Sequence, residues 1–361
     1  MRAVVLVGGE GTRLRPLTYA VPKQLLPVAG QPMLERVLAH LARHGVGEAV
    51  LSLGYRPDAF MAGYPDALAG GVRLSYAVEP EPLDTAGAIR FAATAAGIEE
   101  TFVVVNGDVL TDLALGAMVE FHRHSGALAT IALSTVDDPS RYGVVVTDSR
   151  GQVERFVEKP PPGEAPANHI NAGTYVLEPE VLDRIPAGRR VSVERETFPA
   201  LVASGRLFAM ASAAYWLDTG TPEAYLQASF DILGGLRGLP PLPDAREVSA
   251  GVWVRGDVSI QGEVGRPSLV CQGGVVEAGA SVAGAVVGEG CRVEKGAVLR
   301  RSVMLAGSVL CRDASVTDSI VGPGAVVLEG ARISSTSIVG PGVRVAAGSV
   351  VEGARLARED G

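Results

Sequence analysis

Apolar residues along roughly the first 230 positions follow two alternating patterns. Segments with helical spacing lie between short apolar runs; the clearest is Pro32–His44, with Gly45 as its stop signal. The runs that predict strands are Ala3–Val7, Ala49–Leu53, Arg73–Glu79, Thr101–Val105 and Leu128–Val136. Strands alternating with helices predict an α/β fold with a mainly parallel sheet and helices on both faces. Ligands of such sheets bind at the carboxyl ends of the strands.

The C-terminal third has a different period. Apolar residues recur every six positions at Val321, Val327, Ile333, Val339, Val345 and Val351, and earlier at Val287, Val293, Leu299, Val303 and Val309. Two Gly-Pro-Gly turns, Gly322–Gly324 and Gly340–Gly342, lie 18 residues apart, which is three such repeats. A period of six within a period of 18 predicts a three-sided β-solenoid with one repeat on each side. It resembles left-handed β-helix domains.

These two patterns divide the chain. We expect an α/β domain over residues 1–233 and a solenoid over 248–361. Between them, residues 234–247 are rich in glycine and proline and have no apolar period, so they are predicted to be a linker.

The first predicted strand runs into a glycine-rich turn, Gly8-Gly9-Glu10-Gly11-Thr12-Arg13. Glycines allow a tight turn whose backbone N–H groups face a phosphate, and Arg13 and Lys23 add two cations. The turn is not a P-loop, because no lysine follows Gly11, nor a dinucleotide fingerprint, because Leu14 occupies the place of the third glycine. It therefore predicts a site for another polyanion.

Composition narrows the class of protein. The net charge of −8 argues against nucleic-acid binding, which requires a basic surface. The apolar run at the start, about five residues, is too short for a signal peptide or membrane helix, so we expect a cytoplasmic protein. Lysine occurs only at Lys23, Lys159 and Lys295, among 32 basic residues. Keeping lysine at two motif positions fits sites that need a compact cation.

Asp108 follows a buried strand in the segment TFVVVNGD, and Asp218 lies in WLDTGTP. Carboxylate oxygens suit Mg²⁺, whose coordination shell the phosphates of a substrate would complete. We therefore expect these two aspartates to hold Mg²⁺. Thr219 or Thr221 is expected to cap the helix Pro222–Leu233.

The motifs taken together resemble the sugar-1-phosphate nucleotidyltransferase family. Its signature G-x-G-T-R-L-x-P-L-T followed by P-K occurs at Gly9–Thr18 and Pro22-Lys23. The segment Glu79–Gly87 is similar to the family's base-binding L-G-T-A-G, but has Asp84 in place of a glycine. The segment Phe156–Pro160, FVEKP, is similar to the family's sugar-phosphate motif.

This resemblance implies a role for each matching residue. Arg13 and Lys23 would be catalytic, and Gly8, Gly9, Gly11, Thr12 and Arg13 would bind the triphosphate. The base would be bound by Glu79, Thr85, Ala86 and Gly87. The sugar phosphate would be bound by Gly107, Tyr142, Gly143, Glu158, Lys159, Asn171 and Gly173. The metal ligands would be Asp108 and Asp218.

The implied reaction joins a sugar 1-phosphate to a nucleoside triphosphate and releases pyrophosphate. The segments INAGTYVL, VSVERETFP and WLDTGTP look most like mannose-1-phosphate guanylyltransferases, whereas KQLLPV looks more like glucose-1-phosphate thymidylyltransferases. A non-catalytic subunit that binds nucleotide sugars is a third possibility, although every expected metal ligand and phosphate cation is present.

The solenoid needs a separate account. Solenoids of this kind can be acyltransferases, which usually require a histidine base, but all five histidines precede residue 171. We therefore expect the solenoid to assemble subunits into a homo-oligomer or to respond to an effector. The three cysteines, Cys271, Cys291 and Cys311, form no C-x-x-C pair and are predicted to be small apolar residues.

Overall fold

The computed structural model describes residues 1–238 and 240–358. The chain forms two compact units, one of Met1–Gly9 with Leu34–Trp216 and the other of Glu10–Met33 with the residues from Leu217 onward. These bounds differ from the sequential division at residue 233, which remains a prediction. Leu239, in the predicted linker, and residues 359–361, at the end of the predicted solenoid, lie outside the described residues.

A ten-stranded mixed sheet forms the first unit. Its parallel centre is β7-β1-β4-β6, flanked by the antiparallel strands β5 and β12. The strands of the sheet are β1 (Arg2–Leu6), β4 (Glu48–Leu53), β5 (Leu68–Ala69), β6 (Val72–Val78), β7 (Phe102–Asn106), β9 (Ala129–Thr135), β10 (Gly143–Thr147), β11 (Val153–Glu158), β12 (His169–Leu177) and β13 (Leu207–Ala211). All five predicted strands are present, with bounds that differ by one or two residues.

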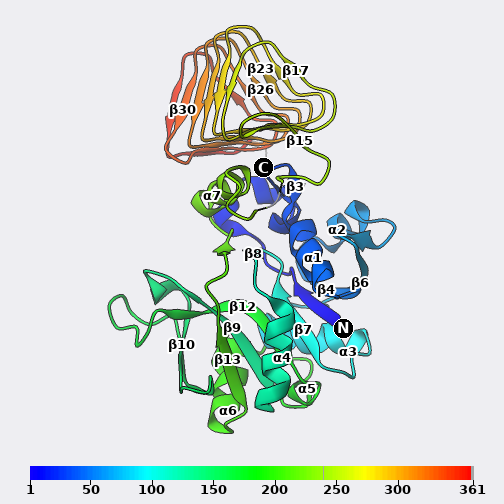
Figure 1. The fold of residues 1–361 in the computed structure, drawn as a ribbon. Helices are drawn as coiled ribbons and strands as arrows, with labels where there is room; N and C mark the ends of the chain where they lie inside the picture. Colours follow the sequence, from blue (N-terminus) through cyan, green and yellow to red (C-terminus); the bar gives the residue numbers. More distant parts are fainter. Residues whose placement is uncertain (239, 359–361) are drawn as a thin grey trace. The chain divides into compact units, whose positions relative to one another are not determined.

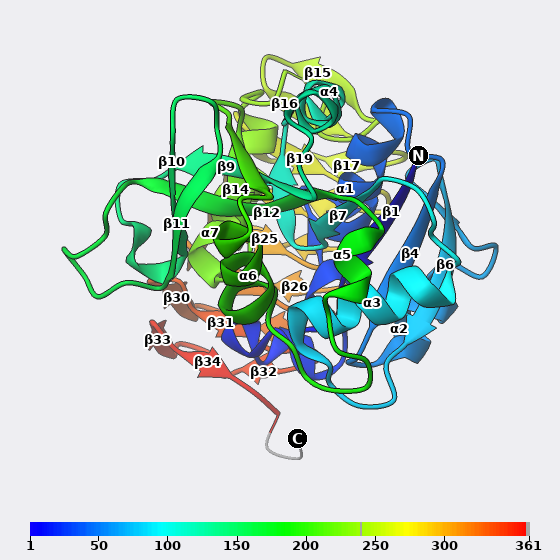
Figure 2. The same cartoon turned by 90° about the horizontal axis from the view of Figure 1, so that it is seen from below.

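Helices cover this sheet, and α3 crosses β1 and β4 (Figure 2). The helices are α1 (Met33–Arg43), α2 (Pro57–Gly63), α3 (Asp84–Ala95), α4 (Leu115–Ser125), α5 (Glu180–Asp183) and α6 (Phe198–Ala203). The shorter elements of the unit are β8 (Val109–Thr111), a 3-10 turn at Pro139–Arg141 and a π-helical turn, η5, at Val193–Thr197; β14 (Trp216–Asp218) follows β13. The helix predicted at Pro32–His44 is confirmed as α1.

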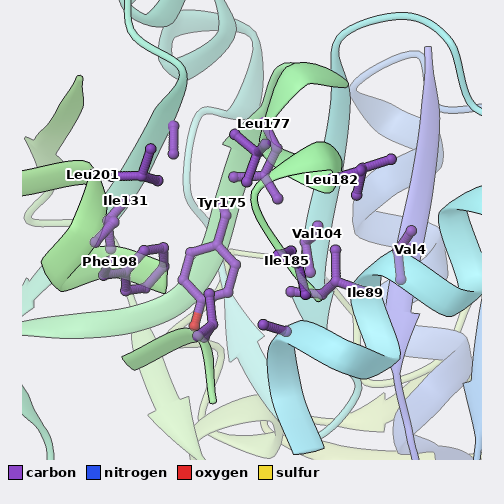
Figure 3. Packing of buried hydrophobic residues seen from close by; sticks show 14 of the residues in the cluster. Val4, Ile89, Val104, Ile131, Tyr175, Leu177, Leu182, Ile185, Phe198 and Leu201 are labelled. Carbon is purple, nitrogen blue, oxygen red and sulfur yellow. The ribbon is translucent and has the colours of Figure 1, made fainter. Parts of the chain in front are cut away.

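The core beneath these helices is built around aromatic contacts (Figure 3). The rings of Tyr175 and Phe198 meet edge to face with their centroids 5.2 Å apart, and both are buried. Ile131, Leu177 and Leu201 pack in the same cluster. Because Phe198 begins α6 directly after η5, this core fixes the turn that enters the candidate site.

A buried histidine on α4 links three elements. The Nδ1 atom of His122 lies 2.8 Å from Thr130 Oγ1, and its Nε2 atom lies 3.0 Å from Glu178 Oε1. Thr101 Oγ1 also donates to that carboxylate oxygen. Burial lowers the pKa of His122, while the hydrogen bond from Glu178 opposes the shift. The side chain is structural, as the sequence indicated.

This lowered pKa predicts a loss of stability in mild acid. Below a pH of about 6.5 the unfolded chain binds a proton that the native imidazole does not, so the free energy of unfolding falls by at most ~1.4 kcal/mol per pH unit. The melting temperature of the wild type should therefore drop more between pH 7.5 and 5.5 than that of His122→Gln, measured by circular dichroism. Parallel curves for the two proteins would remove His122 as the cause.

The second unit contains the three-sided solenoid (Figure 1). Its sides are parallel sheets of eight, six and six strands, apart from the antiparallel first pair β15-β16. The eight-stranded sheet, side D, runs β15-β16-β19-β22-β25-β28-β31-β34, and its strands are β15 (Arg246–Ser249), β16 (Val252–Val254), β19 (Ser268–Val270), β22 (Val286–Val287), β25 (Val303–Met304), β28 (Ile320–Val321), β31 (Ile338–Val339) and β34 (Arg355–Leu356). This architecture confirms the predicted solenoid and is consistent with a left-handed β-helix.

The two other sheets complete each coil. One contains β17 (Ser259–Ile260), β20 (Val275–Val276), β23 (Arg292–Val293), β26 (Val309–Leu310), β29 (Val326–Val327) and β32 (Arg344–Val345). The other contains β18 (Glu263–Gly265), β21 (Ser281–Ala283), β24 (Val298–Arg300), β27 (Ser315–Thr317), β30 (Arg332–Ser334) and β33 (Val350–Glu352). Cys271 and Cys291 are buried and Cys311 is partly buried, in keeping with their expected apolar role.

The register of the solenoid corrects one detail of the sequence pattern. Ile320 pairs with Ile338, 18 residues on, but Val286 pairs with Val303, only 17 residues on. The residues that point inward here are therefore Met304 and Leu310, and the assignment of Val303 and Val309 to the interior was wrong. Val303 is nevertheless buried, because side D is apolar on its outer face as well.

The glycine-rich segment of the second unit consists of short turns and a hairpin. These are η1 (Thr12–Leu14), η2 (Leu17–Tyr19), η3 (Lys23–Leu25), β2 (Pro27–Val28) and β3 (Gln31–Pro32). Helix α7 (Pro222–Leu233) packs beside them: Ser229 Oγ accepts from Ala29 N at 3.2 Å, and Tyr225 donates to the carbonyl of Pro27. Thr221 caps α7, as one of the two predicted threonines, by accepting from Ala224 N.

No helix among the described residues is both long and apolar enough to cross a membrane.

Candidate active site

Four parallel strands of the first unit end at one edge of the sheet. Gly8 and Gly9 follow β1, Gly54 follows β4, Glu79 follows β6, and Gly107 with Asp108 follows β7. Gly8 and Gly54 lie close together, since a side chain on Gly8 would be 3.4 Å from the Gly54 nitrogen. Gly107 N donates to Leu6 O at 2.9 Å, and any side chain at 107 would press on Val7. These glycines leave the edge open to a ligand.

Glu79 places a carboxylate at this edge. Its Oε1 accepts from Ser52 Oγ at 3.0 Å, and its Oε2 accepts from Leu83 N at 3.0 Å. A Cβ on Gly8 would lie 3.5 Å from Oε1. Each carboxylate oxygen retains a lone pair for a further hydrogen bond. The fixed carboxylate is therefore an acceptor pair aimed at whatever lies over Gly8.

The residues after Glu79 are held by the segment that precedes η5. Asp84 has φ 61°, a left-handed conformation that explains why the family pattern has glycine there. It begins α3 and accepts from Thr85 N at 2.8 Å. The amides of Ala86 and Gly87 both donate to Val191 O. A base contact from Ala86 or Gly87 would therefore use atoms other than these amides.

The antiparallel strand β12 brings Asn171 and Gly173 to the same edge, beyond the end of β7. Asn171 Oδ1 accepts from Gly173 N at 3.0 Å, and its Nδ2 donates to Tyr175 Oη at 3.0 Å. Gly173 has φ 71°, and a Cβ there would lie 2.6 Å from Asn106 Nδ2. The sequence brought Asn171 and Gly173 to attention but not Asn106, which abuts them.

Glu158 and Lys159 stand where β11 ends. Lys159 has φ 48°, so the chain turns at this residue, and the Nζ atom lies 3.4 Å from Glu158 Oε1. Lys159 N donates to Tyr142 O at 3.0 Å, and Gly143 leaves room for the Glu158 carboxylate. Burial and the nearby Glu194 raise the pKa of Glu158, and Lys159 lowers it. The turn thus aims both side chains to one side, as expected from the prolines that follow.

Two further residues were missed by motif reading. Glu194, on the π-helical turn η5, accepts from Thr85 Oγ1 and from Ser192 Oγ, each at 2.9 Å. Trp216 packs edge to face on Tyr142 and donates from Nε1 to Ala172 O at 2.8 Å. Both neighbour predicted sugar-phosphate residues. The segment containing Glu194 was noticed only as part of a family resemblance, because a π-helical turn has no sequence period of its own.

The second unit contributes the cations. Gly11 has φ 64°, and a Cβ on it would meet Thr18 and the Lys23 stem at 3.0 and 3.1 Å. Thr12 and Arg13 form η1 directly after it. The Arg13 guanidinium is half-exposed and lies 3.9 Å from Asp218 Oδ2. The loop therefore presents a positive charge beside a carboxylate, the combination that a metal-bound polyphosphate requires.

The residues present fit a Mg²⁺ ion that is completed by substrate. No group of three or more histidine, cysteine or acidic side chains within residues 1–238 and 240–358 is placed to hold a metal by itself. Mg²⁺ is usually bound by one or two carboxylates together with substrate phosphates and water. Asp108 and Asp218 supply suitable oxygens, and Asp218 also accepts from Gly220 N at 2.8 Å, which orients its carboxylate.

Family models cover both parts of the chain. The nucleotidyl transferase family matches residues 2–234, and the GMPPB C-terminal domain matches residues 264–358. The chain belongs to the nucleotidyl transferase family, whose members generally use a divalent metal ion.

Relatives narrow this class further. The mannose-1-phosphate guanylyltransferase of Mycobacterium tuberculosis is 41% identical over 310 residues, 82% of each chain. Mannose-1-phosphate guanylyltransferase 1 of Arabidopsis thaliana is 38% identical over 313 residues, 83% of this chain and 84% of the relative. A solved structure, HddC from Yersinia pseudotuberculosis complexed with GMP-PN, has a TM-score of 0.55 and 31% identity, and covers 63% of this chain and 97% of its own.

Proposed function

We propose that this protein is a mannose-1-phosphate guanylyltransferase, which converts mannose 1-phosphate and GTP into GDP-mannose and pyrophosphate. The observation that supports it most is the similarity to relatives of that name across more than four fifths of both chains, solenoid included. The thymidylyltransferase and the non-catalytic subunit are outcomes that the experiment below distinguishes.

The chemistry we propose is an in-line displacement. A phosphate oxygen of the sugar phosphate attacks the α-phosphorus of the nucleotide, and pyrophosphate leaves. Phosphoryl transfers of this kind need positioning and charge neutralisation more than covalent help from the protein. Lys159 would hold the attacking phosphate, and Lys23 would neutralise charge at the α-phosphate. Arg13 and the backbone of Gly8–Thr12 would hold the departing pyrophosphate.

Asp108 and Asp218 would hold Mg²⁺, and the bound ion would add positive charge beside the phosphates. Glu158 and Asn171 would accept and donate hydrogen bonds to the sugar hydroxyls. Glu194 stands close enough to Glu158 to raise its pKa, so we assign it to the same sugar pocket.

Glu79 is our proposed determinant of the base. Guanine has adjacent N1–H and N2–H donors on one edge, which match the two acceptor oxygens of a carboxylate. Thymine and uracil have a single N3–H flanked by carbonyl oxygens, which a carboxylate would repel. A carboxylate held by Ser52 and Leu83 therefore favours guanine.

Glu79→Gln should relax this choice. The amide offers one donor and one acceptor, so one hydrogen bond to guanine is lost. With GTP, kcat/KM should fall by roughly 10- to 100-fold, the cost of about 1.5–3 kcal/mol for a hydrogen bond to a charged group. With thymidine triphosphate it should rise. Glu81→Gln, an exposed neighbour, is the control. An unchanged ratio of kcat/KM for the two nucleotides would refute the assignment.

The function itself is tested by supplying each nucleoside triphosphate with mannose 1-phosphate or glucose 1-phosphate and Mg²⁺, and measuring pyrophosphate release. GTP with mannose 1-phosphate should be the best pair. Release only with thymidine triphosphate and glucose 1-phosphate would identify the thymidylyltransferase, and no release with any pair would identify a non-catalytic protein.

We also propose a cytoplasmic homo-oligomer that assembles through the solenoid. Val275, Val309 and Val326 are half-buried residues on the outer face of one solenoid side, where the neighbouring Val276, Leu310 and Val327 point inward. A row of exposed apolar side chains on a sheet favours contact with another copy. Sedimentation velocity would show the assembly, and a purely monomeric species at micromolar concentration would contradict it.

A further inference from the structure

The solenoid touches the glycine-rich loop at a turn that has no side chain. Gly340 opens the second Gly-Pro-Gly turn, directly after β31, and its N donates to Leu356 O of the next coil at 2.7 Å. A Cβ at this position would lie 2.9 Å from Pro16 Cγ and 3.3 Å from Pro16 Cβ. Both Gly340 and Pro16 are buried. The missing side chain is what lets the coil approach the loop so closely.

Pro16 is connected to Arg13 by two tight turns. Leu14 N donates to Gly11 O at 2.9 Å, Arg15 N to Thr12 O at 3.2 Å, and Tyr19 N to Pro16 O at 3.3 Å. Thr18 Oγ1 closes the loop by donating to Gly11 O at 2.9 Å. Since Leu14 and Leu17 are buried, the segment has little freedom to absorb a shift at Pro16. A displacement there would be passed to the Arg13 guanidinium.

The other end of the loop rests on an earlier coil. Gly30, in the β2–β3 hairpin, has φ 79°, and a Cβ on it would meet Leu269 and Cys271 at 3.1 and 3.2 Å. Leu269 lies on β19 and Gly340 follows β31, four strand steps apart on side D. At ~4.8 Å a step, the two anchors are about 19 Å apart. The cation-bearing loop is therefore fixed at both ends along one sheet of the solenoid.

We propose that the solenoid is a positioning element of the transferase reaction, in which the Gly340 turn, through Pro16, holds Arg13 where it neutralises the triphosphate. This role is additional to the assembly or effector response expected from the sequence. It rests on the proposed function, because it assigns Arg13 to the nucleotide. Gly340 and Pro16 are positioning residues, since neither would touch a substrate.

The chain supplies a matched control for this contact. Gly322 occupies the same place in the Gly-Pro-Gly turn one coil earlier, is buried, and donates to Val339 O at 2.8 Å. A Cβ on Gly322 would lie 2.6 Å from that carbonyl oxygen, and one on Gly340 would lie 2.7 Å from Leu356 O. Alanine at either position thus strains the solenoid alike, but only at 340 does it also push on Pro16.

Gly340→Ala should lower kcat/KM for GTP roughly tenfold relative to Gly322→Ala, because sub-ångström misplacement of a catalytic group is costly. The KM for mannose 1-phosphate should be unchanged in both variants, and their melting temperatures should fall equally. Hydrogen exchange should quicken at residues 12–17 only in Gly340→Ala. Equal kcat/KM values for the two variants, with an active wild type, would overturn the proposal.

A second variant covers the case in which Gly340→Ala does not fold. Leu269→Ala removes the support under Gly30 on the outer face of side D, and the solenoid interior stays filled. It should also lower kcat/KM for GTP with the KM for mannose 1-phosphate unchanged, and wild-type kinetics would overturn the proposal. If the wild type itself releases no pyrophosphate, the proposed function fails instead, and the two failures are thereby distinguished.

Discussion

Lys159→Ala is expected to raise the KM for mannose 1-phosphate by roughly 100-fold and to leave the KM for GTP within about threefold. The variant loses a charge-assisted hydrogen bond to the sugar phosphate, worth about 1.5–3 kcal/mol. Lys159 is suited to this task because its left-handed backbone, at φ 48°, turns the side chain away from the strand, and its Nζ atom remains 59% exposed beside Glu158.

A solenoid lysine provides the control for this prediction. Lys295 is exposed and far along the chain, so Lys295→Ala should behave as the wild type. Initial rates at varied mannose 1-phosphate give both constants. A Lys159→Ala enzyme with unchanged kcat and KM for mannose 1-phosphate would show that another group holds the sugar phosphate.

Arg13→Ala should lower kcat by roughly 100- to 1000-fold, the cost of removing one preorganised group that stabilises charge in a transition state. The guanidinium is aimed by its neighbours: it lies 3.9 Å from Asp218, and a side chain at Gly220 would overlap it. Since charge on the departing pyrophosphate grows during the reaction, the loss should fall on kcat more than on the KM for GTP.

Arg15, two residues on, is the matched control. It pairs with Glu10 at 2.7 Å and lies over the Tyr19 ring, so its charge is already engaged on the surface. Arg15→Ala should retain at least about a third of wild-type kcat, since exposed ion pairs contribute at most ~1 kcal/mol. Equal losses in the Arg13 and Arg15 variants, measured by pyrophosphate release, would contradict the distinct role of Arg13.

Local signals carried most of the prediction from sequence. β1 and its glycine-rich turn are adjacent in the chain, so the pattern of five apolar residues and three glycines indicated both the strand and the loop. The sixfold period indicated the solenoid for the same reason. The turn at Lys159 followed from the two prolines after it, and Thr221 capped α7 as its residue type favours.

Contacts between distant segments were beyond the reach of the sequence. Glu194 meets Thr85 across more than a hundred residues, from a π-helical turn without a period, so only the fold reveals it. The packing of Gly30 on Leu269 places residues 10–33 in the unit that contains the solenoid, a grouping that composition along the chain does not indicate. The inward positions of Met304 and Leu310 were misread because side D is apolar on both faces.

The most direct test of the proposed reaction follows the oxygen atoms of the sugar phosphate. Mannose 1-phosphate carrying ¹⁸O at its three non-bridging phosphate oxygens would be incubated with GTP, Mg²⁺ and the full-length enzyme, and the products analysed by mass spectrometry. The account predicts GDP-mannose that retains all three labels, together with unlabelled pyrophosphate. Labelled pyrophosphate, or the absence of GDP-mannose, would contradict it.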